Sequence, residues 1–529
     1  MNFKSLFLLA AGAAMFSACS NDEPAVKPNV PVDEQGNSYL TVVLAQTESA
    51  RADFEEGTLS ENAVKDLRFY FFDKDGNAAN VKEVNNVKVN WVKAEPTKNG
   101  ADMDNVSAVY KAVVVINTEE GDQIPEYIYA VANYTQLALG DASKNRADFA
   151  AISNDYTALD GKFPMVNSVY AKDGKAVYTT LIPKECYKTN ATDAEASPVK
   201  VYIERPVVKV RVNVEGGARV ALNEAGTTKP LVVDGEQLYL NILGWKTVGT
   251  SKETRLQKEI VASWNPFSGW NNATAFRSFW AQNSKTFAES DINYFKHSEM
   301  RNALGTAEFV NENAANSADG TVRSNEYPVQ VVIAGQVVKA DNSPVTLYRF
   351  LSKEPLAGLE NLKTFALSMF QQEGYKIVKG SVISDLALAD IKLVTAAEIG
   401  KANIAEGSYG RYKSYFQVAD ATASYQHNGA ACNVSEVNDA LVNLGAVQLY
   451  NTGYNYYYFP ITHTGGLKGV VRNHVYDCKV TKIAGLGTPV YDPEQTIIPE
   501  KPENDNTVIA ASVNVLSWKV VPNNVTVEW

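Results

Sequence analysis

The stretch VYIERPVVKVRVNV at residues 201–214 has the clearest two-residue period in this chain. Four valines of one parity share a face of the extended strand: Val208, Val210, Val212 and Val214. Polar side chains of the other parity share the opposite face: Lys209, Arg211 and Asn213. The pattern predicts a β-strand with one face packed and one face in water, and we expect it to open a second domain.

The composition is that of a globular protein rich in β-structure. Of 529 residues, 45% are hydrophobic and 21% are charged, which is typical neither of disorder nor of a coiled coil. Tyrosine and valine are frequent, and Gly, Asn and Asp separate short apolar runs, which favours strands and turns. Because a single core stops growing at about 250 to 300 residues, two domains is the simplest expectation.

Most of the regular segments predict strands. Besides the opening stretch, we expect strands at residues 67–72, 108–116, 127–132, 238–243 and 329–338. Apolar residues recur at helical spacing in residues 356–369, which predicts an amphipathic helix. A second helix is expected at residues 435–444, with Ser435 as its N-cap. The fold class predicted from the sequence is therefore mainly β with few short helices.

Both ends of the chain read as strands joined to the body by separable segments. Residues 37–51, NSYLTVVLAQTESAR, form an alternating strand that ends in a polar loop and one arginine. Residues 507–529, TVIAASVNVLSWKVVPNNVTVEW, hold two more strand-like runs beyond a linker at 492–506 that contains three prolines. This layout predicts a polymer subunit with one strand to remove and one to donate. In the alternative interpretation, both ends complete the sandwich of a monomer.

The apolar side chains of the final segment alternate in a way that suits a donated strand. Val513 and Val515 fall on one face, and Leu516, Trp518 and Val520 fall on the other. A turn at residues 522–524 follows. Beyond it, one face carries three further apolar residues: Val525, Val527 and Trp529.

The first nineteen residues read as an export signal. Lys4 precedes an apolar stretch at residues 6–16, which is too short for a permanent transmembrane helix. The stretch ends in FSAC, which resembles the lipobox of bacterial lipoproteins and makes Cys19 the predicted lipidation site. The alternative is an ordinary secretory signal cleaved near the same place.

The sequence carries no recognisable catalytic motif. The remaining cysteines, Cys186, Cys432 and Cys478, form no CxxC pair, and their disulfide state stays open. The four histidines lack metal-ligand spacing, and no nucleophile elbow or phosphate-binding loop is present. The net charge of −11 argues against a nucleic-acid surface. We therefore expect no enzyme activity, no cofactor, no metal and no nucleic-acid partner.

One aromatic cluster has two interpretations. It comprises Tyr450, Tyr454, Tyr456, Tyr457, Tyr458 and Phe459. A row of tyrosines is able to stack on sugars, because each ring is apolar and carries a polar hydroxyl. Consecutive residues of a strand point to opposite sides, however, so a core strand is the favoured interpretation.

Several motifs resemble the Bacteroidales fimbrillins, the type V pilins. The stretch GVVRNHVYDCKVTKIAGLG at residues 469–487 is similar to a strand near the end of the body of these proteins. ERPVVKVRV at residues 204–212 and VNVLSWKVVPNNVTVEW at 513–529 look like the domain junction and the C-terminal appendage of the same family. Within the family, the closest resemblance is to the shaft subunit of Porphyromonas minor fimbriae.

The resemblance implies a maturation pathway and a domain plan. In this family an arginine-specific protease removes the N-terminal segment of a lipoprotein precursor, and the matching bond here is Arg51–Ala52. The implied segments are a signal with lipobox at 1–19, a propeptide with the first strand at 20–51, β-domains at 52–203 and 204–491, and a linker with donor strands at 492–529. The implied fold is two tandem β-sandwich domains of transthyretin-like type with a C-terminal donor-strand appendage.

The implied function is that of a structural subunit of a cell-surface fimbrium, which supports adhesion and biofilm formation. Its implied partners are copies of itself, anchor and tip subunits, the arginine-specific protease, and a host or bacterial surface receptor of unknown identity. The implied location is the outer membrane, followed by the fimbrium. Two alternatives remain at this stage: a monomeric surface lipoprotein that binds glycans, and a tip subunit of the same fimbriae.

Overall fold

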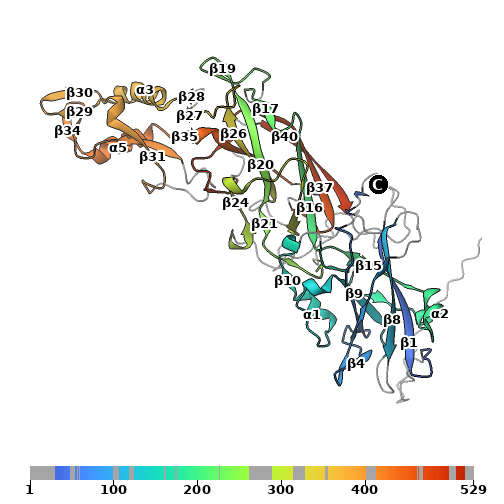
Figure 1. Cartoon of the computed structure of the whole chain (residues 1–529). Helices are drawn as coiled ribbons and strands as arrows, with labels where there is room; N and C mark the ends of the chain where they lie inside the picture. The colour runs from blue at the N-terminus through green and yellow to red at the C-terminus, as the bar shows by residue number, and fades with distance from the viewer. Residues whose placement is uncertain are drawn as a thin grey trace, which may run out of the picture.

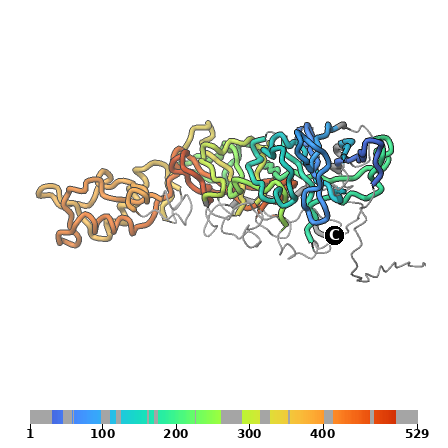
Figure 2. The backbone as a smooth tube through the Cα atoms, turned by 90° about the horizontal axis from the view of Figure 1, so that it is seen from below, coloured from blue at the N-terminus to red at the C-terminus, as the bar shows by residue number. Residues whose placement is uncertain are grey.

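The computed structural model describes most of the chain between residues 30 and 518. The described ranges are 30–47, 54–55, 57–58, 60–98, 106–117, 124–159, 162–172, 175–224, 227–260, 289–313, 328–351, 355–400, 413–461, 463, 469–499 and 508–518. Strands predominate in these ranges, which also hold four α-helices, so the predicted mainly β fold class is confirmed. The molecule is elongated, with the first sheet at one end and a small helix-containing lobe at the other (Figure 1, Figure 2).

The first sheet collects strands from the N-terminal third of the chain. Its order is β6-β3-β9-β11-β15-β1-β8-β7, with β14 attached to β9. The bounds are β1 Asn37–Thr47, β3 Leu67–Phe72, β6 Trp91–Ala94, β7 Thr97–Lys98, β8 Val106–Asn117, β9 Tyr127–Ala132, β11 Met165–Asn167, β14 Thr180–Leu181 and β15 Val199–Glu204. Strand β3, LRFYFF, is buried on both faces because separate apolar clusters pack on its two sides, one around Phe69 and one around Tyr70.

The stretch at 201–214 is divided between two sheets. Strand β15 ends at Glu204, and β16, Val207–Val214, begins after Arg205 and Pro206. Proline lacks the amide hydrogen that a sheet ladder needs, which explains the break. The prediction that Lys209 meets water is wrong, because its side chain is buried and its Nζ lies 3.2 Å from the Glu61 carboxylate.

A sandwich of two five-stranded sheets follows. One sheet has the order β2-β40-β37-β16-β25 and the other β17-β20-β26-β36-β38. Their bounds are β2 Phe54–Glu55, β17 Arg219–Ala221, β20 Tyr239–Val248, β25 Ala307–Asn311, β26 Gln330–Val338, β36 Tyr454–Pro460, β37 His474–Ala484, β38 Thr488–Pro489 and β40 Val508–Trp518. Val208, Val210 and Val212 of β16 lie in the core between the sheets, as the two-residue period predicts.

The described residues between 347 and 450 form the lobe at the far end of the molecule (Figure 1). Its two sheets have the orders β28-β27-β35-β32-β31 and β30-β29-β33-β34. The bounds are β27 Leu347–Phe350, β28 Leu356–Ala357, β29 Tyr375–Lys379, β30 Val382–Ser384, β31 Ile391–Thr395, β32 Ser414–Val418, β33 Ser424–His427, β34 Ala430–Cys432 and β35 Val447–Tyr450. Helices α3, Leu359–Phe370, and α5, Val434–Asn443, share one apolar core with these strands.

Both predicted helices are present. Helix α3 buries Leu362 and Ala366, as the helical spacing predicts. The N-cap of α5 is Asn433, not the predicted Ser435: the Asn433 side chain accepts from the Glu436 amide at 2.9 Å, and the Glu436 carboxylate accepts from the Asn433 amide. This reciprocal capping box satisfies two backbone amides at once and so fixes the start of the helix. Two short helices, α1 Arg146–Ala150 and α2 Ala191–Glu195, belong to the N-terminal part.

Candidate functional site

Strand β1 occupies an interior position of the first sheet. It pairs antiparallel with β8 over its whole length and parallel with β15 at residues 42–45. Leu40, Val42 and Leu44 point into the apolar core and are at most 1% exposed. On the opposite face, Thr41 and Val43 are also buried. The strand therefore fills a slot that is closed on both faces.

Burial of the β1 side chains contributes considerably to the free energy of folding. Full burial of one large aliphatic side chain is worth about 1.5 to 3 kcal/mol. The three core residues of β1 thus contribute several kcal/mol together, and the strand also completes the ladders of two neighbours. Without β1, the facing edges of β8 and β15 would have unpaired backbone groups and an open apolar floor, and such an edge readily accepts another strand.

A tight turn fixes the entry of β1. The Asp33 carboxylate accepts from the backbone amides of Asn37 and Gln35, each at 2.9 Å, and from the Tyr39 hydroxyl at 3.0 Å. The hydrogen bond from the Asn37 amide, more than the others, lowers the pKa of Asp33. The Tyr39 amide and carbonyl also pair with the backbone of Lys188. The start of β1 is therefore held by the turn at Asp33 and by the backbone of Lys188.

The predicted processing sites lie outside the described residues. These are Cys19, the proposed lipidation site, and Arg51 and Ala52, which flank the proposed cleavage bond. β1 ends at Thr47, four residues before Arg51, so cleavage there separates the whole of β1 from the rest of the chain.

The C-terminal segment is represented by β40, which pairs with its own chain. β40 runs antiparallel to β37 from Ala484↔Val508 to His474↔Ser517. This ladder includes Val513 opposite Cys478, Val515 opposite Tyr476 and Leu516 opposite Val475. At the other edge, β2 pairs with the end of β40 through Phe54↔Ser517 and Glu55↔Trp518. The remaining predicted donor residues, Val520, Val525, Val527 and Trp529, lie outside the described residues.

Buried ion pairs hold the segment after β2 against the second sheet. Glu61 and Asn62 precede β3, and both are buried. The Arg205 guanidinium donates to the Glu61 carbonyl at 3.0 Å and to the Asn62 side chain, while Lys209 pairs with the Glu61 carboxylate. Arg205 lies in the connection between β15 and β16, and Lys209 lies in β16. These contacts therefore join the first sheet to the sandwich that follows it.

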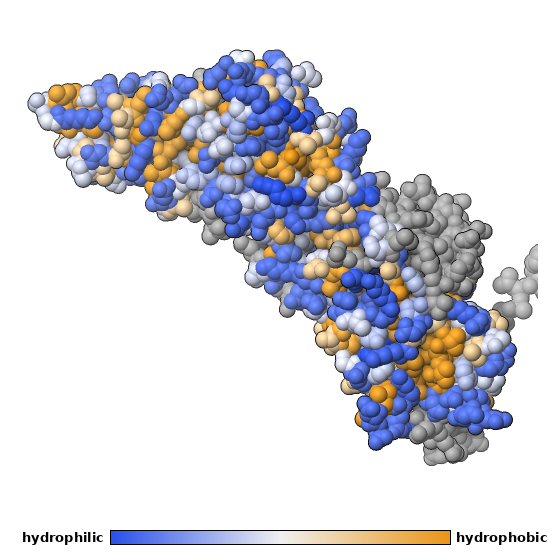
Figure 3. Space-filling model, viewed as in Figure 1, coloured by the Kyte–Doolittle hydropathy of each residue, from blue (hydrophilic) through white to orange (hydrophobic). Residues whose placement is uncertain are grey.

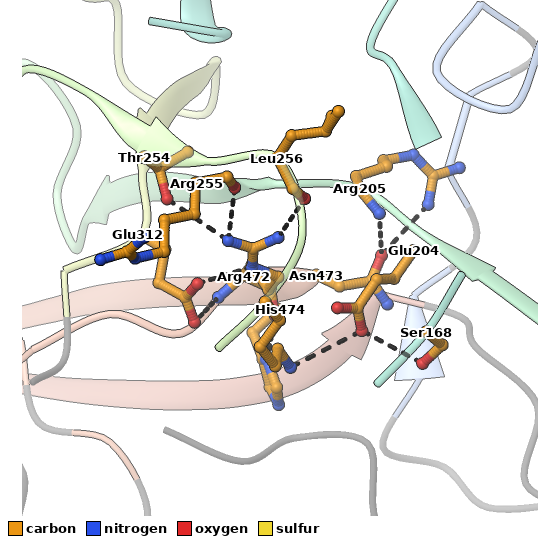
Figure 4. Close-up of polar contacts among 11 residues, drawn as sticks. Ser168, Glu204, Arg205, Thr254, Arg255, Leu256, Glu312, Arg472, Asn473 and His474 are labelled. Carbon is orange, nitrogen blue, oxygen red and sulfur yellow. Dashed lines mark hydrogen bonds and ion pairs between the residues drawn. The ribbon is translucent and has the colours of Figure 1, made fainter. Parts of the chain in front are cut away.

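A second buried network centres on Arg472 (Figure 4). Its Nε donates to the Glu312 carboxylate at 2.6 Å, and its two terminal nitrogens donate to the carbonyls of Leu256 at 2.9 Å and Arg255 at 2.7 Å. Nearby, the Lys258 Nζ lies 3.6 Å from the Glu204 carboxylate, which also accepts from the Ser168 hydroxyl.

Burial displaces the pKa values in this network. It raises the pKa of Glu204 and lowers that of Lys258, and the attraction between the two charges opposes both shifts. Burial also tends to lower the pKa of Arg472, but the Glu312 and Glu204 carboxylates outweigh it and the net shift is upward. The network therefore depends on each charge keeping its partner.

Sequence reasoning did not identify these residues. Arg205 and Arg472 fall within the ERPVV and VVRN stretches, and both are at most 1% exposed. A charged residue inside an apolar run was the available signal, because such a residue is rarely buried without a partner. Their partners lie more than 140 positions away along the chain, so the pairs themselves were not predictable.

The described residues do not assemble a metal-binding centre. Among them, no cluster of three His, Cys, Asp or Glu side chains is placed to hold a metal ion. Cys186 and Cys478 are buried free thiols, and Cys432 is partly buried and free. His297, His463 and His474 are all buried, and His474 is the first residue of β37.

The tyrosine cluster forms a core strand. Tyr456, Tyr457 and Phe459 of β36 are buried, as is Tyr450 at the end of β35, and the Tyr457 hydroxyl donates to the Gly485 carbonyl at 2.9 Å. Tyr456 and Tyr457 point into different apolar clusters on the two sides of the sheet. The favoured interpretation is confirmed, and these rings do not form an exposed sugar platform.

Within the described ranges, no helix has the length and hydrophobicity that crossing a membrane requires.

Comparisons with known proteins give matches among solved structures and one match to a family model. A search of curated proteins finds none with significant similarity to this chain. Among solved structures, a fimbrilin from Porphyromonas gingivalis aligns over 92% of this chain and 98% of its own, with 12% identity and a TM-score of 0.36. The tip fimbrial protein Mfa3 from the same organism, with a C-terminal truncation, aligns over 91% and 100%, with 11% identity and a TM-score of 0.32.

The family model described as "Major fimbrial subunit protein type IV, Fimbrillin, C-terminal" matches residues 448–524. The matched region begins in β35, continues through β36 and β37, and includes β40. It therefore contains Arg472 and the whole ladder between β37 and β40. Residues 448–524 of this chain are therefore similar to the C-terminal part of fimbrillins.

Proposed function

We propose that this protein is the shaft subunit of a cell-surface fimbrium and that it polymerises by protease-activated strand exchange. The observation that carries the proposal is the position of β1: a strand buried on both faces, flanked by two neighbours, and followed within four residues by Arg51. The fimbrillin match at residues 448–524 supports a fimbrial subunit.

In the proposed pathway, Cys19 is lipidated and the precursor reaches the outer membrane. An arginine-specific protease then cuts between Arg51 and Ala52, and the propeptide of residues 20–51 leaves with β1. The empty slot between β8 and β15 accepts apolar residues from the C-terminal segment of another copy. Because donor and acceptor surfaces differ, the contact does not close on itself and a filament grows.

The mature subunit then has the domain plan that the family resemblance implies. β-domains at 52–203 and 204–491 form its body, and residues 492–529 link it to the next copy. Anchor and tip subunits complete the fimbrium, and its biological role is adhesion and biofilm formation. A tip subunit with the same fold is the nearest alternative, and it is distinguished by where the protein lies along isolated filaments.

The N-terminus of the mature surface protein tests the proposal. We expect Edman sequencing of protein released from the cell surface to begin at Ala52. A chain blocked at a lipidated Cys19, with β1 retained in all copies, would contradict polymerisation and support a monomeric lipoprotein. The glycan-binding version of that monomer is disfavoured, because the tyrosines of β36 lie largely in the core.

A further inference from the structure

The lobe lies between two neighbouring strands of the sandwich. β26 and β36 pair antiparallel, with Gln336 opposite Tyr454, yet the chain that connects them contains the whole lobe. A short turn would be enough to join two such strands. The lobe also has an apolar core of its own, which α3, α5 and its two sheets share. It therefore projects from the body, and it contributes no described strand to the sheet that contains β1.

Strand β30 forms an open edge of the sheet at the tip of this lobe. In the order β30-β29-β33-β34, β30 pairs with β29 and with no other described strand. The side chains of Val382 and Ile383 in β30 are 60% and 53% exposed. Figure 3 shows hydrophobic surface at this tip, where β30 lies in Figure 1. Natural edge strands are usually protected by charged residues or proline, and β30, with the sequence VIS, has neither.

The hairpin of β29 and β30 turns the backbone groups of one residue outward. The loop between Lys379 and Val382 has two residues, and Gly380, at its first position, has a φ of 64°. In such a hairpin the two residues that close the turn bond to each other, and the next pair along the strands does not. The amide and carbonyl of Ile383, which belongs to that next pair, therefore point away from β29 and towards the open edge.

We propose that two copies of this chain associate through their lobes, with their β30 edges paired antiparallel about a two-fold axis at Ile383. In this arrangement each Ile383 amide donates to the Ile383 carbonyl of the other copy, and the two tip sheets become one continuous sheet. The same surface of both copies forms the contact, as in most symmetric dimers. The inference goes beyond the proposed function, because it joins subunits side by side through a part of the chain that strand exchange does not use.

The side chains at this edge are complementary to themselves. Ile383 shares a face of the sheet with Val378, its partner on β29. This face is the outer one, because Ile377 on the opposite face is buried in the lobe core. Pairing about Ile383 brings Ile383 and Val378 of both copies into one apolar row. On the other face, Val382 would lie opposite Ser384 of the second copy, so the contact buries no charged residue of β30.

The charge of the lobe favours a second copy as the partner. Residues 347–450 contain nine Lys and Arg and ten Asp and Glu, a net charge of −1, whereas the whole chain has a net charge of −11. Two lobes therefore repel each other little, while two bodies repel each other and stay apart. The nearest lysines to the edge, Lys376 and Lys379, already pair with Asp385 and Asp390 of their own copy. A highly charged partner would find no unpaired charge at these lysines.

A single contact of this kind is small, and a filament would multiply it. Each copy contributes an edge of three residues, which is far less than the interface of about 1,600 Å² that a stable dimer commonly has, so an isolated pair should be weak. Two filaments that lie side by side would present many lobes to each other, and contacts linked in this way strengthen one another. This consequence for filaments rests on the proposed function, whereas the pairing of two lobes does not.

A cysteine at the two-fold axis tests the pairing in the uncleaved chain. Ile383→Cys, in a chain that also carries Cys19→Ala and Cys432→Ser, would place two thiols opposite each other with about 5.5 Å between their Cα atoms, which a disulfide spans. The two cysteines that remain are buried. We expect disulfide-linked dimers after mild oxidation of concentrated protein. The matched control is Val232→Cys, at a side chain of the body that is 49% exposed, and it should give at least tenfold less dimer.

A lysine at the same position tests the contact without a disulfide. Ile383→Lys should prevent pairing, because two ammonium groups would meet at the axis. We expect analytical ultracentrifugation to detect a dimer in the parent chain and in Val232→Lys, and at least tenfold less dimer in Ile383→Lys. The melting temperature should stay unchanged, since the Ile383 side chain is largely exposed. After cleavage, electron microscopy should show Ile383→Lys filaments of normal length that no longer align side by side.

The outcomes separate this inference from the proposed function. A parent chain that is monomeric at about 1 mM, or equal dimer yields from Ile383→Cys and Val232→Cys, would overturn the inference. Linkage of Ile383→Cys to Ala431→Cys of another copy, with none between two Ile383→Cys chains, would also overturn it, because β30 would then pair with β34. Lobe dimers without filaments after cleavage would support the inference and contradict the proposed function.

Discussion

The guanidinium of Arg472 and the carboxylate of Glu312 form a pair that is almost completely inaccessible to water, with 2.6 Å between Nε and Oε2. Glu312 follows β25, and Arg472 precedes β37. The same arginine donates to the carbonyls of Arg255 and Leu256, so three distant segments meet at one side chain. Under the proposed strand exchange, such contacts would keep the body intact while the ends are exchanged.

Loss of this pair should destabilise the precursor strongly. Arg472→Met leaves the Glu312 carboxylate buried without its cation, which costs about 3 to 5 kcal/mol in comparable pairs. Urea denaturation of the uncleaved chain measures the change. Lys376→Met is the matched control, because Lys376 and Asp385 are both more than 40% exposed and such pairs contribute about 1 kcal/mol or less. Equal stability of the two variants would contradict a structural role for Arg472.

Replacing the arginine at the proposed cleavage site should block assembly without unfolding the chain. Arg51→Lys keeps the positive charge but removes the side chain that an arginine-specific protease requires. We expect a folded monomer that retains β1. Treatment with trypsin, which cuts after lysine, should restore filaments, as observed by electron microscopy. Normal filaments from untreated Arg51→Lys would show that activation occurs elsewhere.

The lipobox predicts the chemistry of the N-terminus. Cys19→Ala should abolish incorporation of a labelled fatty acid and strongly reduce the amount of protein at the cell surface. Cys432→Ser serves as the control, since it also removes a thiol but leaves the lipobox unchanged. Equal labelling of the Cys19→Ala chain and its parent would argue for an ordinary secretory signal.

Two truncations should separate assembly from stability. Ending the chain at Trp518 removes only residues 519–529, so the uncleaved protein should melt as the parent does but form no filaments after cleavage. Ending it at Asn506 also removes β40, which pairs with the core strand β37, and should lower the melting temperature by several degrees. If the shorter deletion alone lowers the melting temperature, the last residues belong to the core of their own subunit.

Acid should weaken the folded chain through its buried histidines. Burial lowers the pKa of His297 and His474 to about 4, and it also lowers the pKa of His463 well below its ordinary value. These rings stay neutral in the folded chain while the unfolded chain takes up protons near pH 6.5. Stability should therefore be complete above pH 6.5 and decline towards pH 4.

The raised pKa of Glu204 acts in the opposite direction, since that carboxyl takes up its proton more readily in the folded chain, but it is one group against three. His474→Gln should flatten the decline in melting temperature between pH 6.5 and 4. A slope that is unaffected by His474→Gln would place the acid sensitivity in other groups.

Local patterns predicted the class of the fold and several of its elements. The two-residue period of 208–214 placed three valines in the core, and the helical spacing of residues 356–369 identified α3, because both signals depend only on near neighbours. The break at Pro206 was also visible in principle, since proline interrupts a ladder. What the pattern could not supply was the partner of Lys209, because Glu61 lies 148 positions earlier in the chain.

The candidate site was likewise predictable only in part from local patterns. Alternation predicted a strand with apolar side chains within residues 37–51, but not that β8 and β15 enclose it, because strand order depends on the whole sheet. Likewise, the apolar pattern of β40 suits either a donated strand or a resident one. Only the ladder with β37 separates these possibilities for the precursor.

The neighbours of β1 also determine how a filament would respond to tension. β1 pairs with β8 along all eleven of its residues, and it pairs with β15 along its other edge. A strand pulled along its own axis loads all of these backbone hydrogen bonds together in shear, whereas a strand peeled from one end loads them one at a time. A fimbrium joined through this slot would therefore hold a cell to a surface under flow by sharing the force across both ladders of every joint.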